Sequence, residues 1–391
     1  MKHFLFFLFL LGHSFVFCQK EIPIMAFHGV QTNNVEDFKK FREAGFSISL
    51  KAFQSTADAI DNMNAASKAG VKVFVYTDSL MLNPEIIVPK IKDNLGLYGY
   101  YVADEPSVKD FDKVGWRTYN IRKTDNNLHP VYINLFPNYA GANQLGVVGY
   151  SDYLELFMKK VNVDFISFDN YPVKGNTLDK NWYDNLEQIR KLSNKYQKPF
   201  WAYANATIFQ EYAQPTKAGI RIQQYSNLLY GAKGLQYFTY WTLEKSYREK
   251  NNYRYSIVDE NGNKTPTYTI IENFNKQVQK LAWIFMDSHV TQVYHVGKTL
   301  PIGVVKMARL PENFVKLDTN GKEALISAME NEKQKFILIL NKDLNNTLKL
   351  SYQVQSNVKS VNSSTGSLEA IKTKNTITLL PGDLYIFTYN Q

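Results

Sequence analysis

LYGYYVADEP, residues 97–106, is an apolar and aromatic run that ends abruptly in two carboxylates and a proline. Such residues favour a buried strand, and Pro106 ends it because proline has no backbone N–H to donate. The surrounding chain repeats the pattern, since short apolar strands alternate with amphipathic helices. The expected strands lie at residues 22–28, 46–53, 71–77, 97–103, 131–135, 164–168, 200–204 and 235–241.

Eight strand–helix repeats in sequence order, with strands that are apolar on both faces, favour a closed parallel sheet. The first strand–helix turn, FHGVQ at residues 27–31, lacks the glycine-rich phosphate loop that is typical of open doubly wound sheets. The predicted fold is therefore α/β, a (β/α)8 TIM barrel over residues 19–288. In this fold, the residues that follow the carboxyl ends of the strands meet at one face and carry the chemistry.

The pattern changes after a helix expected at residues 269–284. Short alternating strands are expected at residues 292–296, 324–329, 336–341, 347–352, 376–379 and 384–389. Their spacing predicts a small antiparallel β-sandwich over residues 289–391, packed on the barrel. We expect this domain to stabilise the barrel, and a carbohydrate-binding role is the alternative.

The first residues have the features of a signal peptide. A positive charge at Lys2 precedes an apolar run at residues 5–11, which is too short for a transmembrane span. We predict a signal peptide over residues 1–18 and a secreted or periplasmic protein. Cys18, the only cysteine, leaves an outer-membrane lipoprotein with a lipid anchor as the alternative, although Phe17 is larger than the residue usual before a lipidated cysteine. No other run is long enough to span a membrane.

The charge and motif content argue against several classes of function. The formal net charge is +9, but the lysines are scattered and no nucleic-acid-binding module is recognisable, so we expect no nucleic-acid partner. No cluster of His, Cys, Asp and Glu has metal-ligand spacing, and no GxSxG motif occurs. The sequence therefore predicts no metal, no cofactor and no serine nucleophile.

Carboxylates that follow the strands are the candidate catalytic groups. Glu105 is the candidate general acid, with Asp104 beside it and Asp169 after the strand at residues 164–168. Because strand side chains alternate, Asp104 should point largely away from Glu105. Crowding by other carboxylates should raise the pKa of Glu105, as proton donation requires. The strand at residues 200–204 ends at Asn205, and the nearest acid beyond it is Glu211.

Aromatic and polar residues near the same strand ends are candidates for binding sugars. Sugar rings stack their C–H faces on aromatic rings, and their hydroxyls bind imidazole, amide and carboxylate groups. The candidate substrate-binding residues are His28, Tyr76, Asp78, Tyr101, Asn134, Tyr171, Trp201, Tyr203, Asn205, Trp241 and Glu244.

Three stretches carry a resemblance to a known group of proteins: GYYVADEP at residues 99–106, FISFDNYP at residues 165–172 and YGAKGLQYFTYW at residues 230–241. Together they resemble secreted barrel proteins of Bacteroidota polysaccharide-utilisation systems, which are grouped with clan A glycoside hydrolases near the family 42 β-galactosidases. The resemblance covers residues 20–285 and implies hydrolysis of an oligosaccharide or polysaccharide. It implies an acid/base glutamate, matched by Glu105, and a nucleophilic glutamate after the seventh strand, where this chain has Asn205.

Three mechanisms therefore remain open. Glu211 or Glu244 attacks as nucleophile, or Asp169 acts as the base of an inverting reaction. In the third, the N-acetyl group of the substrate attacks, while Asp104 orients it and Glu105 protonates the leaving oxygen. This arrangement resembles hexosaminidase and chitinase-type barrels. A non-catalytic glycan-binding barrel is the alternative function, because the expected nucleophile is missing.

Overall fold

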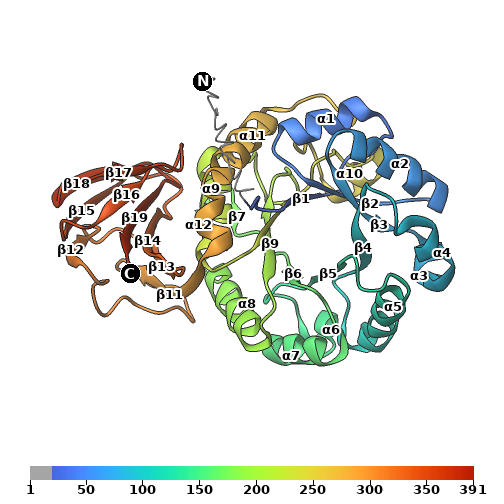
Figure 1. Ribbon diagram of the computed structural model, residues 1–391, viewed down its shortest axis with the longest axis horizontal. Coiled ribbons are helices and arrows are strands. Elements are labelled where there is room, and N and C mark those ends of the chain that lie inside the picture. The colour runs from blue at the N-terminus through green and yellow to red at the C-terminus, as the bar shows by residue number, and fades with distance from the viewer. Residues whose placement is uncertain (1–19) are drawn as a thin grey trace, which may run out of the picture.

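The computed structural model describes residues 20–391, so the predicted signal segment and Cys18 lie outside it. Eight parallel strands close into a barrel, and each pairs with its neighbours along the chain until the last returns to the first (Figure 1). The predicted (β/α)8 barrel is confirmed. Its strands are β1 (Ile24–Phe27), β2 (Ile48–Ala52), β3 (Lys72–Tyr76), β4 (Leu97–Asp104), β5 (Val131–Leu135), β6 (Ile166–Phe168), β9 (Phe200–Asn205) and β10 (Gly234–Phe238).

Helices surround the barrel, and polar residues start several of them. Ser55 accepts a hydrogen bond from the backbone N–H of Asp58 at the start of α2, and Thr216 does the same for Gly219 at the start of α9. The main helices are α1 (Val35–Glu43), α2 (Thr56–Lys68), α4 (Pro84–Ile91), α5 (Phe111–Thr124), α7 (Tyr150–Lys160), α8 (Trp182–Tyr196), α9 (Lys217–Leu229) and α11 (Pro266–Gln279).

Aromatic rings fill the interior of the barrel. Trp201, near the start of β9, stacks on Phe165 with a centroid distance of 4.2 Å and also contacts Phe74. Gly234 is the register partner of Trp201 on β10, and a Cβ atom there would lie 2.3 Å from the Trp201 ring. The indole therefore fits only because its neighbour has no side chain, and the barrel is a packed core rather than a pore.

Gly234→Ala should consequently destabilise the protein by about 1–3 kcal/mol, because the added methyl group overpacks the interior. Gly141→Ala is the matched control, since the nearest atom to a Cβ at Gly141 is 4.0 Å away. Urea unfolding of both variants measures the difference in the free energy of unfolding. Equal stabilities would contradict the close packing of Trp201 on Gly234.

The C-terminal region forms two antiparallel sheets that enclose a second apolar core. The predicted β-sandwich is confirmed. Its larger sheet contains β11 (His289–Val296), β13 (Ala324–Glu330), β14 (Gln334–Asn341), β19 (Leu384–Asn390), β16 (Lys359–Val361) and β17 (Leu368–Ala370). Its smaller sheet contains β12 (Phe314–Asp318), β15 (Leu348–Val354) and β18 (Lys374–Leu379). The prediction missed β12, β16 and β17.

Several elements differ from the sequence-based expectation. The helix expected at residues 269–284 is two helices, because α11 ends at Gln279 and α12 (Ala282–Asp287) follows a short break. The short helices α3 (Asp78–Leu82), α6 (Ala142–Leu145) and α10 (Lys245–Asn251) and the hairpin β7 (Val173–Lys174) and β8 (Thr177–Leu178) were not predicted. The hairpin lies between β6 and α8, where it extends the barrel at its carboxyl end.

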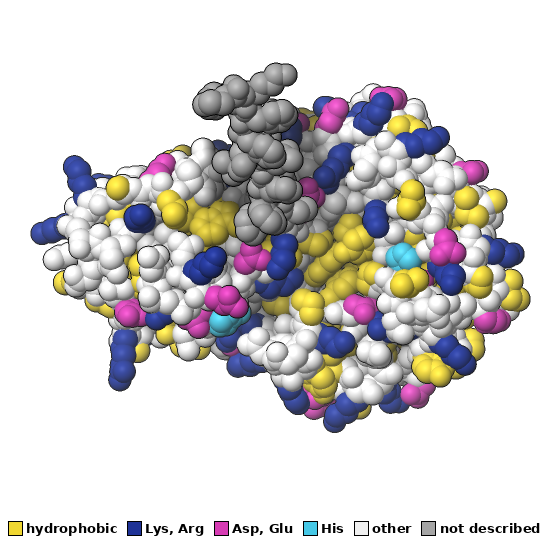
Figure 2. All heavy atoms as spheres, viewed as in Figure 1, with side chains coloured by type: hydrophobic (Ala, Val, Ile, Leu, Met, Phe, Trp, Pro, Cys, Tyr) yellow, Lys and Arg dark blue, Asp and Glu magenta, His cyan; other side chains and the backbone are white. Residues whose placement is uncertain are grey.

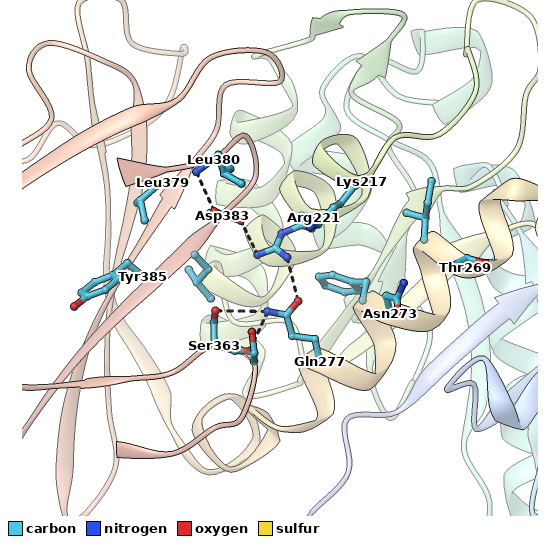
Figure 3. A pocket seen from close by; sticks show the side chains of 14 residues that line it. Lys217, Arg221, Thr269, Asn273, Gln277, Ser363, Leu379, Leu380, Asp383 and Tyr385 are labelled. Carbon is cyan, nitrogen blue, oxygen red and sulfur yellow. Dashed lines mark hydrogen bonds and ion pairs between the residues drawn. The ribbon is translucent and has the colours of Figure 1, made fainter. Parts of the chain in front are cut away.

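The two domains pack together through a continuous apolar core that includes Leu338 and Ile386 of the larger sheet along with barrel residues. Arg221 on α9 is buried there, donates to the Gly382 carbonyl and the Gln277 side chain, and pairs with Asp383 at 3.1 Å. A cavity of about 580 Å³ lies beside this arginine, between α9, α11 and the sandwich (Figure 3).

The surface charge is mixed. Lys and Arg side chains are scattered among Asp and Glu on the face shown in Figure 2 rather than gathered in one block. None of the helices in residues 20–391 is long and apolar enough to cross a membrane.

Candidate active site

A cavity of about 690 Å³ lies at the carboxyl ends of the barrel strands, where Phe27, Asp104 and Phe238 end β1, β4 and β10. One part of its wall is acidic and consists of Asp104, Glu105, Asp169, Asp179 and Glu211. Another part is aromatic and includes Tyr139, Tyr171, Tyr203, Phe209, Tyr212, Phe238 and Tyr253. This combination of carboxylates and aromatic rings is suited to a sugar, whereas the cavity between the domains has a single carboxylate, Asp383, which pairs with Arg221.

Both carboxylates at the end of β4 line this cavity. The expected alternation of Asp104 and Glu105 is wrong, because a bulge between Tyr101 and Ala103 shifts the side on which Asp104 lies, and Glu105 comes after the last residue of β4. Glu105 then adopts a positive φ of 45°, while its N–H still donates to the Asn134 carbonyl at 2.8 Å. Bulges of this kind re-aim side chains beside functional sites, and positive φ at a residue other than glycine is strained.

The Glu105 and Asp169 carboxyls line the same cavity and lie close enough for the charge of Asp169 to raise the pKa of Glu105. Burial, and then the charges of Asp169 and Asp104, raise the pKa of Glu105 to about 8. Burial and the Asp104 charge raise the pKa of Asp169 to about 7. Neighbouring buried carboxylates cannot both ionise without strong repulsion, so the pair holds one proton near neutral pH.

Asn134, near the end of β5, fixes the position of this pair. Its Nδ2 donates to Asp169 Oδ1 at 2.8 Å, and its Oδ1 accepts a hydrogen bond from Ser167 at 2.9 Å. Ser167 in turn accepts a hydrogen bond from Gln236 Nε2 at 2.9 Å. These buried side chains determine which end of the Asn134 amide faces the carboxylates. Burial raises the pKa of Asp104, and a hydrogen bond from Asn134 opposes that shift.

The raised pKa values predict that the free energy of unfolding falls as the pH rises. Folded Glu105 and Asp169 bind protons more tightly than in the unfolded chain, so their stabilising contribution is complete below about pH 4. It is lost as the pH rises through about 7 and then about 8. Glu105→Gln removes one of these groups. The melting temperature of the variant minus that of the wild type should therefore be higher at pH 8.5 than at pH 5, by about 2 °C or more. A constant difference across this range would contradict the raised pKa of Glu105.

The structure brings six of the predicted residues together at the cavity: Asp104, Glu105, Asn134, Asp169, Tyr171 and Tyr203. Tyr203 is held by a hydrogen bond of 2.8 Å between its hydroxyl and that of Tyr132. The other predicted residues do not line the cavity: His28, Tyr76, Asp78, Tyr101, Trp201, Asn205, Trp241 and Glu244.

The two tryptophans are buried among protein atoms. Trp201 lies in the barrel interior beneath the cavity, because it is the second residue of β9 and thus far from the carboxyl end of that strand. Trp241 lies under the loop at residues 259–264, where its Nε1 donates to the Glu260 carbonyl and its ring packs on Gly262. Neither ring is free to stack on a sugar, which corrects that expectation.

Four other predicted residues lie outside the cavity wall. The Tyr76 hydroxyl donates a hydrogen bond of 2.9 Å to the Asp78 carboxylate, so the two side chains bind each other. Tyr101 packs on Phe27, a residue of the cavity wall, with a centroid distance of 6.2 Å. His28 follows Phe27, and burial together with the charge of Lys51 lowers its pKa to about 4, so its ring is neutral at pH 7.

The residues considered for the nucleophile lie in three different surroundings. Asn205 folds back on its own loop, since its side chain donates to the Thr207 carbonyl and accepts from the Thr207 N–H. Glu244 is exposed at the start of α10, outside the cavity. Glu211 does line the cavity and pairs with Lys174 at 3.1 Å, and hydrogen bonds from its own backbone and from Lys174 lower its pKa.

Sequence reasoning missed the parts of the wall that come from loops. Lys174 and Asp179 belong to the hairpin segment, and Phe209, Tyr212 and Tyr253 come from the loops after β9 and β10. Phe209 and Tyr253 stack with a centroid distance of 4.7 Å although they are far apart in the sequence. The aromatic density of TIFQEY at residues 207–212 was the available signal.

Residues 117–281 match the sequence profile of the β-galactosidases of glycoside hydrolase family 42. This barrel resembles those of clan A glycoside hydrolases. The match agrees with the predicted enzyme class, glycoside hydrolase. The match begins after Asp104 and Glu105 and includes Asp169, Asn205 and Glu211. No curated protein sequence matches the chain significantly.

Solved structures with a similar fold include glycosidases. An exo-β-1,4-mannosidase from Opitutaceae bacterium strain TAV5 is 11% identical, with a TM-score of 0.49 over 67% of this chain and 60% of that one. A β-galactosidase from Halorubrum lacusprofundi is 11% identical, with a TM-score of 0.46 over 66% of this chain and 58% of that one. An endo-α-mannosidase from Bacteroides thetaiotaomicron is 10% identical, with a TM-score of 0.46 over 67% of this chain and 98% of that one. The aligned part of this chain thus covers about three fifths of the length of the mannosidase from Opitutaceae and of the β-galactosidase. At these identities the similarity concerns the fold.

Proposed function

We propose that this protein hydrolyses glycosidic bonds of an oligosaccharide or polysaccharide, with Glu105 as the general acid. The observation that supports this most is the position of Glu105 beside Asp104 and Asp169 in a cavity at the carboxyl face of the barrel, where burial and these two carboxylates raise its pKa to about 8. A leaving alkoxide needs a proton, and a glutamate that is still protonated at neutral pH can supply it. The aromatic part of the wall offers surfaces on which sugar rings stack.

Asp169 is best suited to holding and sharing the Glu105 proton. A nucleophile would stand about 5–5.5 Å from the acid, and an inverting base about 6.5–9.5 Å from it. Asp169 lines the same cavity as Glu105, and its charge raises the pKa of Glu105, as expected of a neighbour that helps to hold the proton. We therefore infer that Asp169 and Glu105 act on the same side of the scissile bond.

The attacking group then comes from elsewhere. Glu211 lines the same cavity and is ionised beside Lys174, which favours it as a nucleophile over Glu244. The N-acetyl group of a 2-acetamido sugar is the other candidate, with Asp104 placed beside Glu105 to orient it. Both routes retain the anomeric configuration. They differ because only the first is abolished by Glu211→Gln and only the second requires an N-acetylated substrate.

A screen of the purified protein against polysaccharides and host glycans tests the proposed function, with released sugars detected by mass spectrometry. Release of sugar fragments by the wild type, absent with Glu105→Gln, supports it. NMR of the first-formed anomer tests the mechanism, and inversion would contradict our inference for Asp169. Retention on substrates without an N-acetyl group, lost in Glu211→Gln, would favour Glu211.

A non-catalytic glycan-binding barrel is the second candidate, and one observation favours it. The end of β9 has Asn205 in place of a carboxylate, and that side chain is occupied by its own loop. Affinity electrophoresis in gels that contain each polysaccharide distinguishes the two. Retardation of the wild type without release of sugar from any glycan would support the binding protein.

We also propose that the protein acts outside the cytoplasm, either secreted or periplasmic or attached by a lipid at Cys18 to the outer membrane. The support is the apolar run at residues 5–11 after Lys2. Mass spectrometry of the N-terminus of the mature protein tests this proposal. A mature chain that keeps residues 1–18 would contradict it.

A further inference from the structure

The hairpin β7–β8 forms part of the cavity wall but has little stability of its own. Lys174 and Asp179 of this segment line the cavity. The hairpin pairs only two residues on each side, and two-stranded hairpins of this size are marginal in water. Residues 174–177 are exposed, so apolar burial does not hold them. Contacts from outside the hairpin must therefore fix this wall.

Two contacts join the segment to the barrel domain. Lys174 pairs with Glu211 at 3.1 Å, across the cavity rim, and both side chains are partly exposed. The N–H of Asp179 donates to the Pro172 carbonyl at 2.8 Å, which closes the base of the hairpin. Neither contact involves the C-terminal domain.

Two further contacts join the segment to the C-terminal domain. Lys180 pairs with Glu323 at 2.7 Å, and the Asn345 side chain donates to the Asn176 carbonyl at 3.4 Å. Glu323 lies one residue before β13, and its second oxygen is 3.7 Å from Lys342. The Lys342 side chain is only 1% exposed and contacts His295 Nδ1 at 3.0 Å. Glu323 is therefore held in place from within the sandwich.

We propose that the C-terminal domain positions the β7–β8 wall of the cavity through the Lys180–Glu323 ion pair. Lys180 and Glu323 are then positioning residues for substrate binding, and the sandwich contributes to affinity as well as to stability. This inference rests on the proposed function only for its kinetic consequences. The docking of the two domains does not depend on the pair, because a continuous apolar core and the buried Arg221 join them elsewhere.

Lys180→Met removes the Lys180–Glu323 ion pair. Glu323 itself is unchanged, so it still pairs with Lys342. Lys195→Met is the matched control, because Lys195 pairs with Glu155 at 2.6 Å between α8 and α7, away from the hairpin. Lys180→Arg keeps the charge and should behave as the wild type. Hydrogen exchange of backbone amides in residues 173–180, followed by mass spectrometry, should be faster in Lys180→Met alone. Unchanged exchange in Lys180→Met would overturn the proposal.

Kinetics give the second readout, with the 4-nitrophenyl glycoside that the wild type cleaves fastest. Lys180→Met should raise KM about two- to fivefold, the size expected of one partly exposed ion pair, with kcat within about twofold. A fall in kcat with unchanged KM, or the same KM as in Lys195→Met, would overturn the positioning role. If the wild type cleaves no glycoside, the proposed function fails, and the exchange measurement still decides whether the sandwich orders the hairpin.

Discussion

Glu105→Gln is expected to lower kcat by about 10²- to 10⁴-fold on natural glycosides, whose leaving group cannot depart without a proton. The loss should be far smaller on 2,4-dinitrophenyl glycosides, because that leaving group departs as a stable anion. The amide is nearly isosteric with the carboxyl, so binding of the substrate should stay within a few fold. Steady-state kinetics on both kinds of glycoside measure the contrast.

Glu244→Gln provides the matched control, because Glu244 is exposed at the start of α10 and does not line the cavity. Its kcat and KM should equal those of the wild type. Equal losses of Glu105→Gln on natural and dinitrophenyl glycosides would contradict proton donation by Glu105 and would indicate a structural or electrostatic effect instead.

Asp169→Asn is expected to lower kcat by about 10-fold or more at neutral pH and to shift the alkaline limb of the pH profile. The charge of Asp169 is, after burial, the main cause of the raised pKa of Glu105. An amide removes that charge, so the pKa of Glu105 falls toward its ordinary value near 4.5 and the acid is ionised over more of the neutral range.

The wild-type profile of kcat/KM should therefore fall above about pH 8, and that of Asp169→Asn should fall at a pH lower by about one unit or more. The profiles are recorded from pH 4 to pH 10 with one substrate. An alkaline limb at the same pH in both proteins would contradict the direct coupling of the two carboxyls. Asp179→Asn is the control, because Asp179 lines the same cavity but is not among the groups that shift the pKa of Glu105.

The sequence predicted the parts of the site that regular structure determines. Strand periodicity located the ends of β4, β5 and β6, which is why Glu105, Asn134 and Asp169 were expected at one face and lie together there. It could not predict the bulge after Tyr101, because a bulge depends on pairing with the neighbouring strand. The orientation of Asp104 was therefore predicted wrongly.

The remaining differences also have physical causes. Trp201 is apolar and lies in a strand, and its depth in the barrel is set by Gly234 on the neighbouring strand rather than by local pattern. Loop residues such as Phe209 and Tyr253 meet only after folding and show no periodic signal. The hairpin β7–β8 is too short to be recognised from its composition, and it depends on contacts with a domain more than a hundred residues later in the chain.

A crystal structure of Glu105→Gln soaked with an oligosaccharide that the wild type cleaves would test most directly whether bonds break in this cavity. We predict an intact glycan across the cavity, with its glycosidic oxygen within hydrogen-bonding distance of the side-chain amide at position 105 and its rings stacked on the aromatic wall. A glycan bound only elsewhere, in the cavity beside Arg221 or on the sandwich, would contradict the assignment of Glu105 as the general acid.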